Sequence, residues 1–384
     1  MENQTEQAIN NHPAADSRPS DPEARIFLAS QWKLMWWKFT RHKLAMAGAV
    51  IVILGYLTAL FAEFLAPYDP NQVSIKYQLS PPSLLRMRDV EGRWHLPFVY
   101  DLQRSLDLEQ MQLSFKPDTS RRYPVKLLVR GHSYKLWGLF PSDRHLFGVE
   151  GGAEWHPLGT DRMGRDILSR VIYGTRISMS IGLIGVFLSL FLGVTIGGFS
   201  GYFGGVFDTV TQRVIELLRS IPSLPLWLAL SAALPPGWPP LRIYFGITII
   251  LSLIGWTNMA RIVRGKFLTL REEDFVMAAR LCGAGKSRIV FFHMVPSFLS
   301  HIIASVTLAI PGMIIGETSM SFLGVGLRPP VISWGVLLQE GQNIQSIALS
   351  PWVLSPGVFV VITVLAFNFL GDGLRDAADP YASI

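Results

Sequence analysis

Long apolar runs separated by polar segments are the main pattern of the chain. A transmembrane helix needs about 20 mostly apolar residues, and six stretches reach or approach that length. They are residues 44–66, 177–199, 214–234, 243–263, 298–315 and 353–370. The third and fifth contain prolines, which membrane helices tolerate where neighbours satisfy the freed backbone groups. The pattern predicts an all-α polytopic membrane protein with about six transmembrane helices.

The polar segments divide the chain further. Residues 1–42 are predicted to be an N-terminal tail that ends in an interfacial segment rich in tryptophan and lysine. Residues 43–66 form the first predicted transmembrane helix, and residues 67–176 form a long polar segment. Residues 177–384 contain the other five helices and a polar loop at 264–296.

Alternating apolar and polar residues at 123–129 indicate short strands. We therefore expect a small, partly β insertion at residues 71–155. Cations crowd the 264–296 loop, whereas the loops expected on the opposite side carry only Arg242 and Arg328. Short loops rich in Lys and Arg stay in the cytoplasm. Both termini and the 264–296 loop are thus expected in the cytoplasm, and the insertion outside it.

Composition agrees with this organisation. Hydrophobic residues make up 49% of the chain and charged residues 16%, against about 25% charged in soluble domains. This balance argues against a soluble enzyme. A single cysteine, Cys282, excludes an internal disulfide. The net charge of +6 follows from the basic loop, so it does not indicate nucleic-acid binding.

Small residues recur every four positions in the second stretch, at Gly185, Ser189, Gly193 and Gly197. This spacing places them on one helix face, where a second helix can approach closely. We interpret them as a helix-packing seam rather than a ligand site.

Charged groups near the apolar stretches are hypotheses for function. Glu317 follows the fifth stretch, and it either faces a translocation path or pairs with an arginine from this chain or from a partner chain. Arg165, Asp166 and Arg170 are expected to form an ion-pair cluster before the second stretch. No group of residues has the spacing of metal ligands, and no clustered acids, histidines or Ser–Lys pair indicate a membrane-embedded enzyme.

Residues 280–287 end like a phosphate-binding loop, but Arg280 replaces the first glycine and no apolar strand precedes it. Nucleotide binding by this chain is therefore not expected. Residues 272–282 instead favour a helix that Gly283 can end. Its small residues Ala278, Ala279 and Gly283 indicate either a docking element or an ordinary amphipathic connector.

The same loop resembles the "EAA" loop of ATP-binding-cassette importer permeases. Ala278 and Ala279 are followed by Gly283, and His293 and Pro296 complete the motif. Other segments resemble the dipeptide/oligopeptide/nickel group of these permeases, and the segment 67–70 is typical of its C-type subunit. The matching segments are residues 156–161, 164–166, 173–178, 201–205, 321–326, 333–335 and 370–376.

The resemblance implies a type I ABC importer permease fold in a bacterial cytoplasmic (inner) membrane. It also implies a second, homologous permease subunit, two ATP-binding subunits and an extracytoplasmic solute-binding protein as partners. ATP and Mg would be used by the ATP-binding subunits, and this chain would bind no cofactor and have no catalytic residues. Peptides or similar small polar solutes are the expected cargo.

The role of the insertion stays open, and a different class of transporter is the alternative to an importer permease. The 71–155 insertion departs from the group's common pattern, and it either contacts the binding protein, lids the cavity mouth, or is a packing decoration. A self-contained secondary transporter would show inverted repeats, and no such repeat is evident across the two halves of the sequence.

Overall fold

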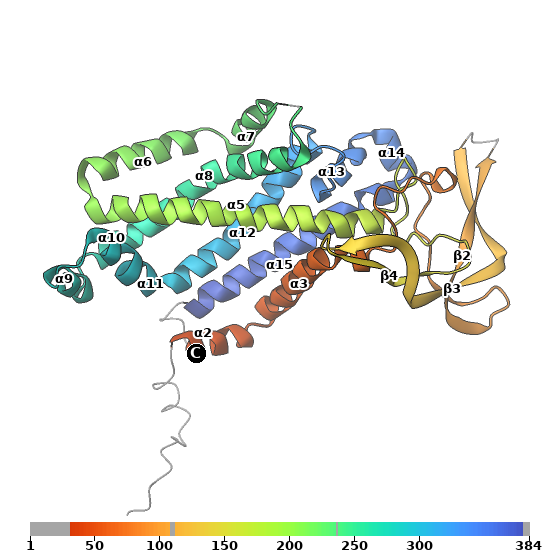
Figure 1. Cartoon of the computed structure of the whole chain (residues 1–384), viewed down its shortest axis with the longest axis horizontal. Coiled ribbons are helices and arrows are strands. Elements are labelled where there is room, and N and C mark those ends of the chain that lie inside the picture. The colour runs from red at the N-terminus through yellow and green to blue at the C-terminus, as the bar shows by residue number, and fades with distance from the viewer. Residues whose placement is uncertain (1–30, 108–111, 236, 379–384) are drawn as a thin grey trace, which may run out of the picture.

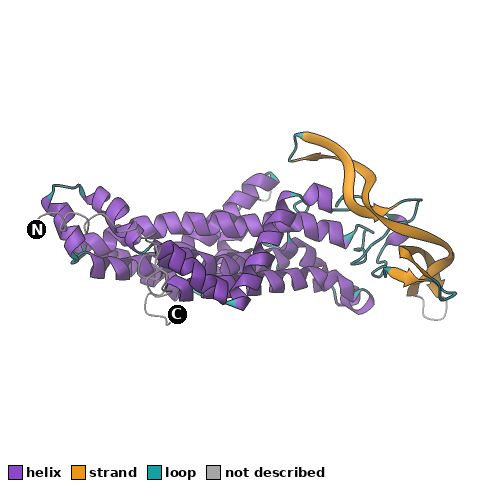
Figure 2. Ribbon diagram, turned by 90° about the horizontal axis from the view of Figure 1, so that it is seen from below, coloured by secondary structure: helices purple, strands orange, loops and turns teal. Residues whose placement is uncertain are grey.

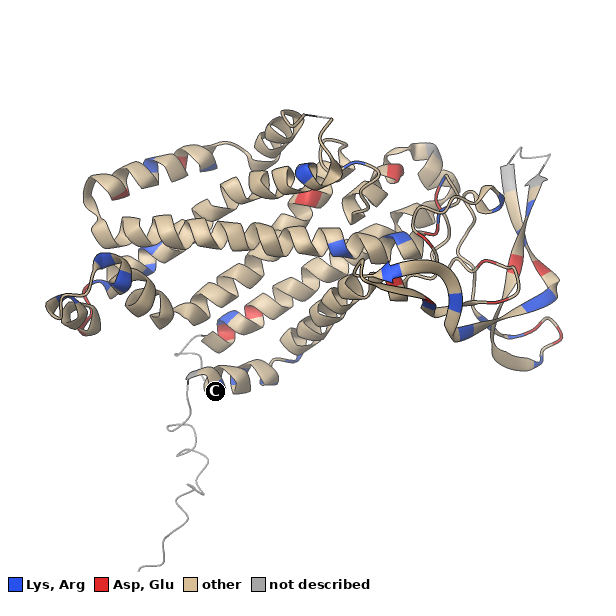
Figure 3. Cartoon of the chain, in the orientation of Figure 1, with Lys and Arg blue, Asp and Glu red and all other residues tan. Residues whose placement is uncertain are grey.

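The computed structural model of the chain describes residues 31–107, 112–235 and 237–378. The predicted tail therefore lies outside the described residues, apart from its last part. Helices run side by side along the long axis, and an antiparallel sheet stands at one end (Figures 1 and 2). Lys, Arg, Asp and Glu gather near the two ends, with few along the middle (Figure 3). That distribution is expected of a helical bundle whose middle part lies in the hydrocarbon core of a bilayer.

The helical segments follow the predicted apolar runs. Five helices are long and apolar enough to cross a membrane, and a bent pair makes up to six, which confirms the predicted all-α polytopic class among the described residues. The helices are α2 (Gln31–Arg41), α3 (Lys43–Leu60), α4 (Ala62–Leu65), α5 (Ile167–Phe203), α6 (Gly205–Ser220), α7 (Ser223–Ala232), α8 (Pro240–Leu270), α9 (Asp274–Leu281), α10 (Lys286–Arg288), α11 (Val295–Ser297), α12 (Leu299–Phe322), α13 (Trp334–Leu338), α14 (Ile344–Leu349) and α15 (Ser355–Ala378).

The third predicted span is not one straight helix. Instead of a continuous run at 214–234, α6 and α7 meet at a bend of 87°. Ile221 is extended, as residues before proline tend to be, and Pro222 has no N–H to continue the helix. The third predicted span is therefore broken at Pro222, and counted as one span the pair brings the total to six in the described residues.

Helix α5 is longer than its apolar core. It has 37 residues, or about 55 Å, against a hydrocarbon thickness of about 30 Å. Its N-terminal turns therefore project beyond the membrane toward the sheet. Asp166 caps this end by accepting a hydrogen bond from the backbone N–H of Ser169.

The insertion is a four-stranded antiparallel sheet in the order β1-β2-β3-β4, which confirms its predicted partly β character. The strands are β1 (Arg86–Arg88), β2 (Trp94–Asp107), β3 (Gln112–Leu136) and β4 (Phe140–Val149). The long strand β3 pairs with β2 along its first part and with β4 along its second. The segment at 123–129 lies where β3 passes from one partner to the other.

The seam of small residues faces α8. A Cβ at Gly193 would lie 2.5 Å from that of Met259, and one at Gly197 would collide with the carbonyl oxygen of Ala260. Ser189 donates a hydrogen bond to the carbonyl of Ser252 at 3.3 Å. Gly185 lies farther along, where a Cβ would meet Ser252 and Met313 at ordinary contact distance. Close packing of α5 on α8 leaves no room for a ligand there.

Candidate functional site

Helix α9 lies at the end of the bundle opposite the sheet (Figure 1). It spans Asp274–Leu281, within the predicted helical range, and Gly283 follows with a φ of +77°. A left-handed residue just after a helix is commonly glycine, because other side chains are strained there. The predicted helix and its end at Gly283 are confirmed.

The inner side of α9 is fixed to the membrane helices. Val276 has no exposed surface, and it packs in one apolar cluster with Phe267 of α8, Val194 of α5, and Met294 and Phe298 just before α12. Burying a valine side chain contributes about 1.5–3 kcal/mol. Helix α9 therefore packs on the Ile289–Met294 segment, and the same apolar cluster includes residues of α5 and α8.

The outer side of α9 is open. Leu281 is 88% exposed, and Phe275 and Met277 are also exposed. Ala278 and Gly283 lie on this exposed surface, but Ala279 is half-buried against the apolar cluster. Ala279 is therefore partly covered by the chain itself, and its role in docking stays a prediction, like those of Ala278 and Gly283.

The remaining residues of the predicted coupling loop lie between α9 and α12. His293 is half-buried in a π-helical segment, Ile289–Met294, and Pro296 is exposed in α11. Arg280, the first residue of the segment that resembles a phosphate-binding loop, contacts another part of the chain. The Arg280 guanidinium lies 5.0 Å from the ring centre of Tyr202 at the end of α5, a cation–π distance.

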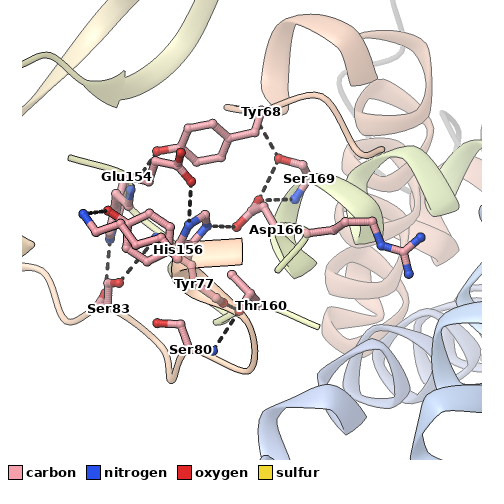
Figure 4. A network of polar contacts seen from close by, with 12 residues as sticks. Tyr68, Tyr77, Ser80, Ser83, Glu154, His156, Thr160, Asp166 and Ser169 are labelled. Atoms are coloured by element: carbon pink, nitrogen blue, oxygen red, sulfur yellow. Dashed lines mark hydrogen bonds and ion pairs between the residues drawn. The ribbon is translucent and has the colours of Figure 1, made fainter. Parts of the chain in front are cut away.

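A second site, a buried polar network, joins the insertion to the membrane helices (Figure 4). The ring of His156 is buried, with Nδ1 3.0 Å from a carboxylate oxygen of Asp166 and Nε2 3.2 Å from one of Glu154. Asp166 also accepts a hydrogen bond from the Ser169 hydroxyl at 2.7 Å. That hydroxyl accepts one from the backbone N–H of Tyr68 at 3.1 Å. The network ties the chain after α4, the end of the insertion and the start of α5 together.

The arginines beside this network have a different partner from the one predicted. Arg165 and Arg170 lie 2.6 and 3.0 Å from the carboxylate of Asp161, and Arg165 also contacts Glu340 at 3.2 Å. Asp166 pairs with His156 instead. The predicted ion-pair cluster of Arg165, Asp166 and Arg170 is therefore wrong in one respect: the acid that pairs with the two arginines is Asp161. Sequence reasoning left Asp161 without a role, although it belongs to the 156–161 motif.

The charge of His156 makes the network pH-dependent. Burial disfavours the imidazolium, but hydrogen bonds with Asp166 and Glu154 outweigh it and raise the pKa of His156 from 6.5 to about 9. A pKa raised in the folded state means that the stabilisation is complete below pH 6.5 and is lost as pH rises through about 9. It corresponds to on the order of 3 kcal/mol.

We therefore expect the melting temperature of the detergent-solubilised chain to fall between pH 6.5 and pH 9.5. The His156→Gln variant is the matched control, because it cannot titrate there and should show a flatter profile. Parallel profiles for the two proteins would contradict this assignment.

Glu317 lies on α12 and has no exposed surface. Its carboxylate accepts hydrogen bonds from Ser321 at 2.8 Å, Ser333 at 2.7 Å and Ser178 at 3.4 Å. Within the described residues it contacts no arginine of this chain, and its side chain is fully buried. In this chain Glu317 joins α5, α12 and the N-terminus of α13, which Ser333 caps. A position beside the path and a pair with an arginine of a partner chain stay predictions.

We expect Glu317→Ala to lower stability by about 2 kcal/mol or more, because three buried hydroxyl groups lose their acceptor. Glu317→Gln keeps an acceptor oxygen and should cost much less. Thermal unfolding of both variants, compared with uptake, checks this. Wild-type stability of the alanine variant with altered solute preference would support the path interpretation.

The long apolar helices and the polar segments at the two ends of the bundle define a multi-pass membrane protein. Residues 193–383 match the family model described as "binding-protein-dependent transport system inner membrane component". Residues 30–82 match the "N-terminal TM domain of oligopeptide transport permease C". The chain belongs to this family of inner-membrane transport components, which confirms the resemblance to C-type importer permeases.

Three relatives show how far the similarity extends. The chain is 32% identical over 352 residues to oligopeptide transport system permease protein OppC of Bacillus subtilis, covering 91% of this chain and 90% of the relative. It is 30% identical over 374 residues to di/tripeptide transport system permease protein DppC of Pseudomonas aeruginosa, covering 97% of each. OppC of Salmonella typhimurium is 42% identical over 250 residues, 64% of this chain and 76% of the relative. As a permease subunit, the chain is not itself an enzyme.

Proposed function

We propose that this chain is half of the translocation path of an ATP-dependent importer for peptides or similar small polar solutes. Relatives named as oligopeptide and di/tripeptide permeases support the solute class. The solute itself would be selected by a separate solute-binding protein. The bacterial inner membrane is the proposed location, with both ends of the chain in the cytoplasm.

The observation that carries this proposal is the two-sided character of α9. Its buried Val276 is fixed to α5, α8 and the segment before α12, while Leu281 projects into solvent. Two ATP-binding subunits, each docked on one permease and using ATP and Mg, would push such a helix. Rigid movement of the attached spans then alternates access between the two sides. No residue of this chain needs to touch nucleotide.

A second, homologous permease is supported by helix α6. Thr211 and Ile215 bury one side of it, and Ile215 packs against α8. The other side exposes apolar residues four apart, Val206, Val210 and Val214. A row of exposed apolar residues beside such a buried side is commonly covered by protein or lipid. We propose that the second permease covers this face, and that the path lies between the two subunits.

Orientation is supported by what lies at each end. Helices α2 and α9 and the last turn of α15 share one end, and the sheet occupies the other (Figure 1). With the basic 264–296 loop in the cytoplasm, the sheet faces the side from which a binding protein delivers solute. Contact with that protein, a lid over the cavity mouth and a packing decoration remain the alternatives for the 71–155 insertion as a whole.

Reconstitution tests the proposal. We expect uptake of short peptides into vesicles only when the chain is assembled with a second permease, ATP-binding subunits and binding protein, and only with ATP. The chain alone should show no saturable ATP binding. Uptake driven by an ion gradient without the ATP-binding subunits would contradict the proposal and indicate a secondary transporter.

A further inference from the structure

The turn between β3 and β4 reaches back from the sheet to the first transmembrane helix (Figures 1 and 2). The indole N–H of Trp137 donates a hydrogen bond to the carbonyl oxygen of Leu60, the last residue of α3, at 2.7 Å. The Trp137 ring also packs on Phe61, with ring centres 5.8 Å apart. This contact sets the height of the turn relative to α3.

The length of helix α3 shows where the turn would lie relative to the bilayer. It spans Lys43–Leu60, 18 residues, or about 27 Å, close to the thickness of about 30 Å of a hydrocarbon core. With Lys43 at one interface, Leu60 lies near the other, on the side of the sheet. Trp137 therefore lies at the level where tryptophans are enriched in membrane proteins.

The exposed side chains of this turn are also apolar. Trp137, Leu139 and Phe140 are 46%, 73% and 59% exposed. In water this cluster would leave apolar surface uncovered, whereas at an interface the same surface is stabilised by lipid. The exposed Leu54 and Leu57 of α3 continue the apolar surface into the bilayer.

A groove of about 620 Å³ lies between the turn and the first helices. Its volume falls within the range of about 300–1,000 Å³ usual for small-molecule sites. The walls are mainly apolar, and six of the lining residues are Leu54, Leu57, Phe61, Leu65, Leu136 and Phe140.

The few polar groups of the groove have partners within the chain. The Thr58 hydroxyl donates to the carbonyl of Leu54 at 2.8 Å, and the Tyr134 hydroxyl donates to that of Arg144 at 2.6 Å. The Ser142 hydroxyl accepts from the backbone N–H of Arg144 at 3.3 Å. A polar ligand would therefore gain little here, but a hydrocarbon chain needs no such group.

We propose that this groove holds an acyl chain of a phospholipid from the leaflet on the sheet side, and that the β3–β4 turn anchors the insertion in that interface. Depth, apolar walls, satisfied polar groups and continuity with the surface of α3 all favour lipid as the occupant. The anchor would hold the sheet beside the first helix, and it does not depend on which solute is transported.

Fluorescence quenching tests the proposal in the full-length chain. In a Cys282→Ser background, which removes the only cysteine, bimane is attached at Leu139→Cys, beside the groove. The chain is reconstituted in phosphatidylcholine vesicles with or without bromine on the acyl chains. We expect bromolipid to lower bimane emission at least twofold. Leu127→Cys, equally exposed at 76% but far along β3, is the matched control and should not respond.

Two further measurements separate the occupants. Thr58→Phe fills the groove, and it should reduce the quenching at position 139 substantially; unchanged quenching in that variant would overturn acyl-chain binding. The quenching should also persist when the second permease and ATP-binding subunits are assembled. Its loss on assembly would show that a protein subunit covers the groove, and would overturn the proposal as well.

Discussion

The Leu281→Arg variant is expected to show ATP-dependent uptake reduced by roughly tenfold or more. Replacing a central apolar residue of a protein interface commonly weakens binding by that factor or more. Leu281 is 88% exposed at the end of α9 and makes no contribution to the chain's own apolar clusters. A cation there places a charge at the proposed docking surface without disturbing Val276. Uptake and stimulation of ATP hydrolysis should fall together, while the melting temperature stays near that of the wild type.

The choice of position 281 avoids a confounding effect. Gly283 has a positive φ, so a bulky residue there would strain the end of α9 as well as block a partner. Leu84→Arg is the matched control, because Leu84 is comparably exposed at the other end of the molecule. Normal coupling in the Leu281→Arg variant, or an equal loss in the control, would rule out α9 as the docking surface.

The Asp166→Ala variant is expected to be destabilised by about 3 kcal/mol or more. Removing one partner of a buried ion pair typically costs about 3–5 kcal/mol, and loss of an N-cap costs about 0.5–2 kcal/mol. Asp166 has both roles, since it pairs with His156 and caps α5. Thermal unfolding of the solubilised chain measures the effect.

Asp166→Asn separates the two roles of this residue. The amide oxygen can still cap α5, but the charge opposite His156 is gone. We expect an intermediate loss of stability and a pKa of His156 below that in the wild type, because one of its two acid partners in the described structure is lost and Glu154 remains. Equal stability of all three proteins near pH 7 would show that the network does not hold the insertion to the bundle.

Local patterns determined much of this fold. The number of spanning segments follows from the length of apolar runs, because every membrane helix must satisfy its own backbone hydrogen bonds. The end of α9 follows from Gly283, which alone tolerates a left-handed conformation without strain. Alternation at 123–129 likewise predicted strands, since successive residues of a strand point to opposite faces.

Partners that lie far apart in the chain needed the tertiary structure. Asp161 rather than Asp166 pairs with the arginines, and three serines from α5, α12 and the cap of α13 surround Glu317. Side-chain spacing along one segment says nothing about which other segment packs against it.

The sequence by itself thus determined the class of protein, the spanning segments and the helix that ends at Gly283, because these depend on interactions within a few residues. Only the tertiary structure decided the pairing of Asp166 with His156, the partial burial of Ala279 and the groove beside Trp137. Those features depend on how separate helices and strands pack, where burial and hydrogen-bond geometry select one partner among several chemically equivalent ones.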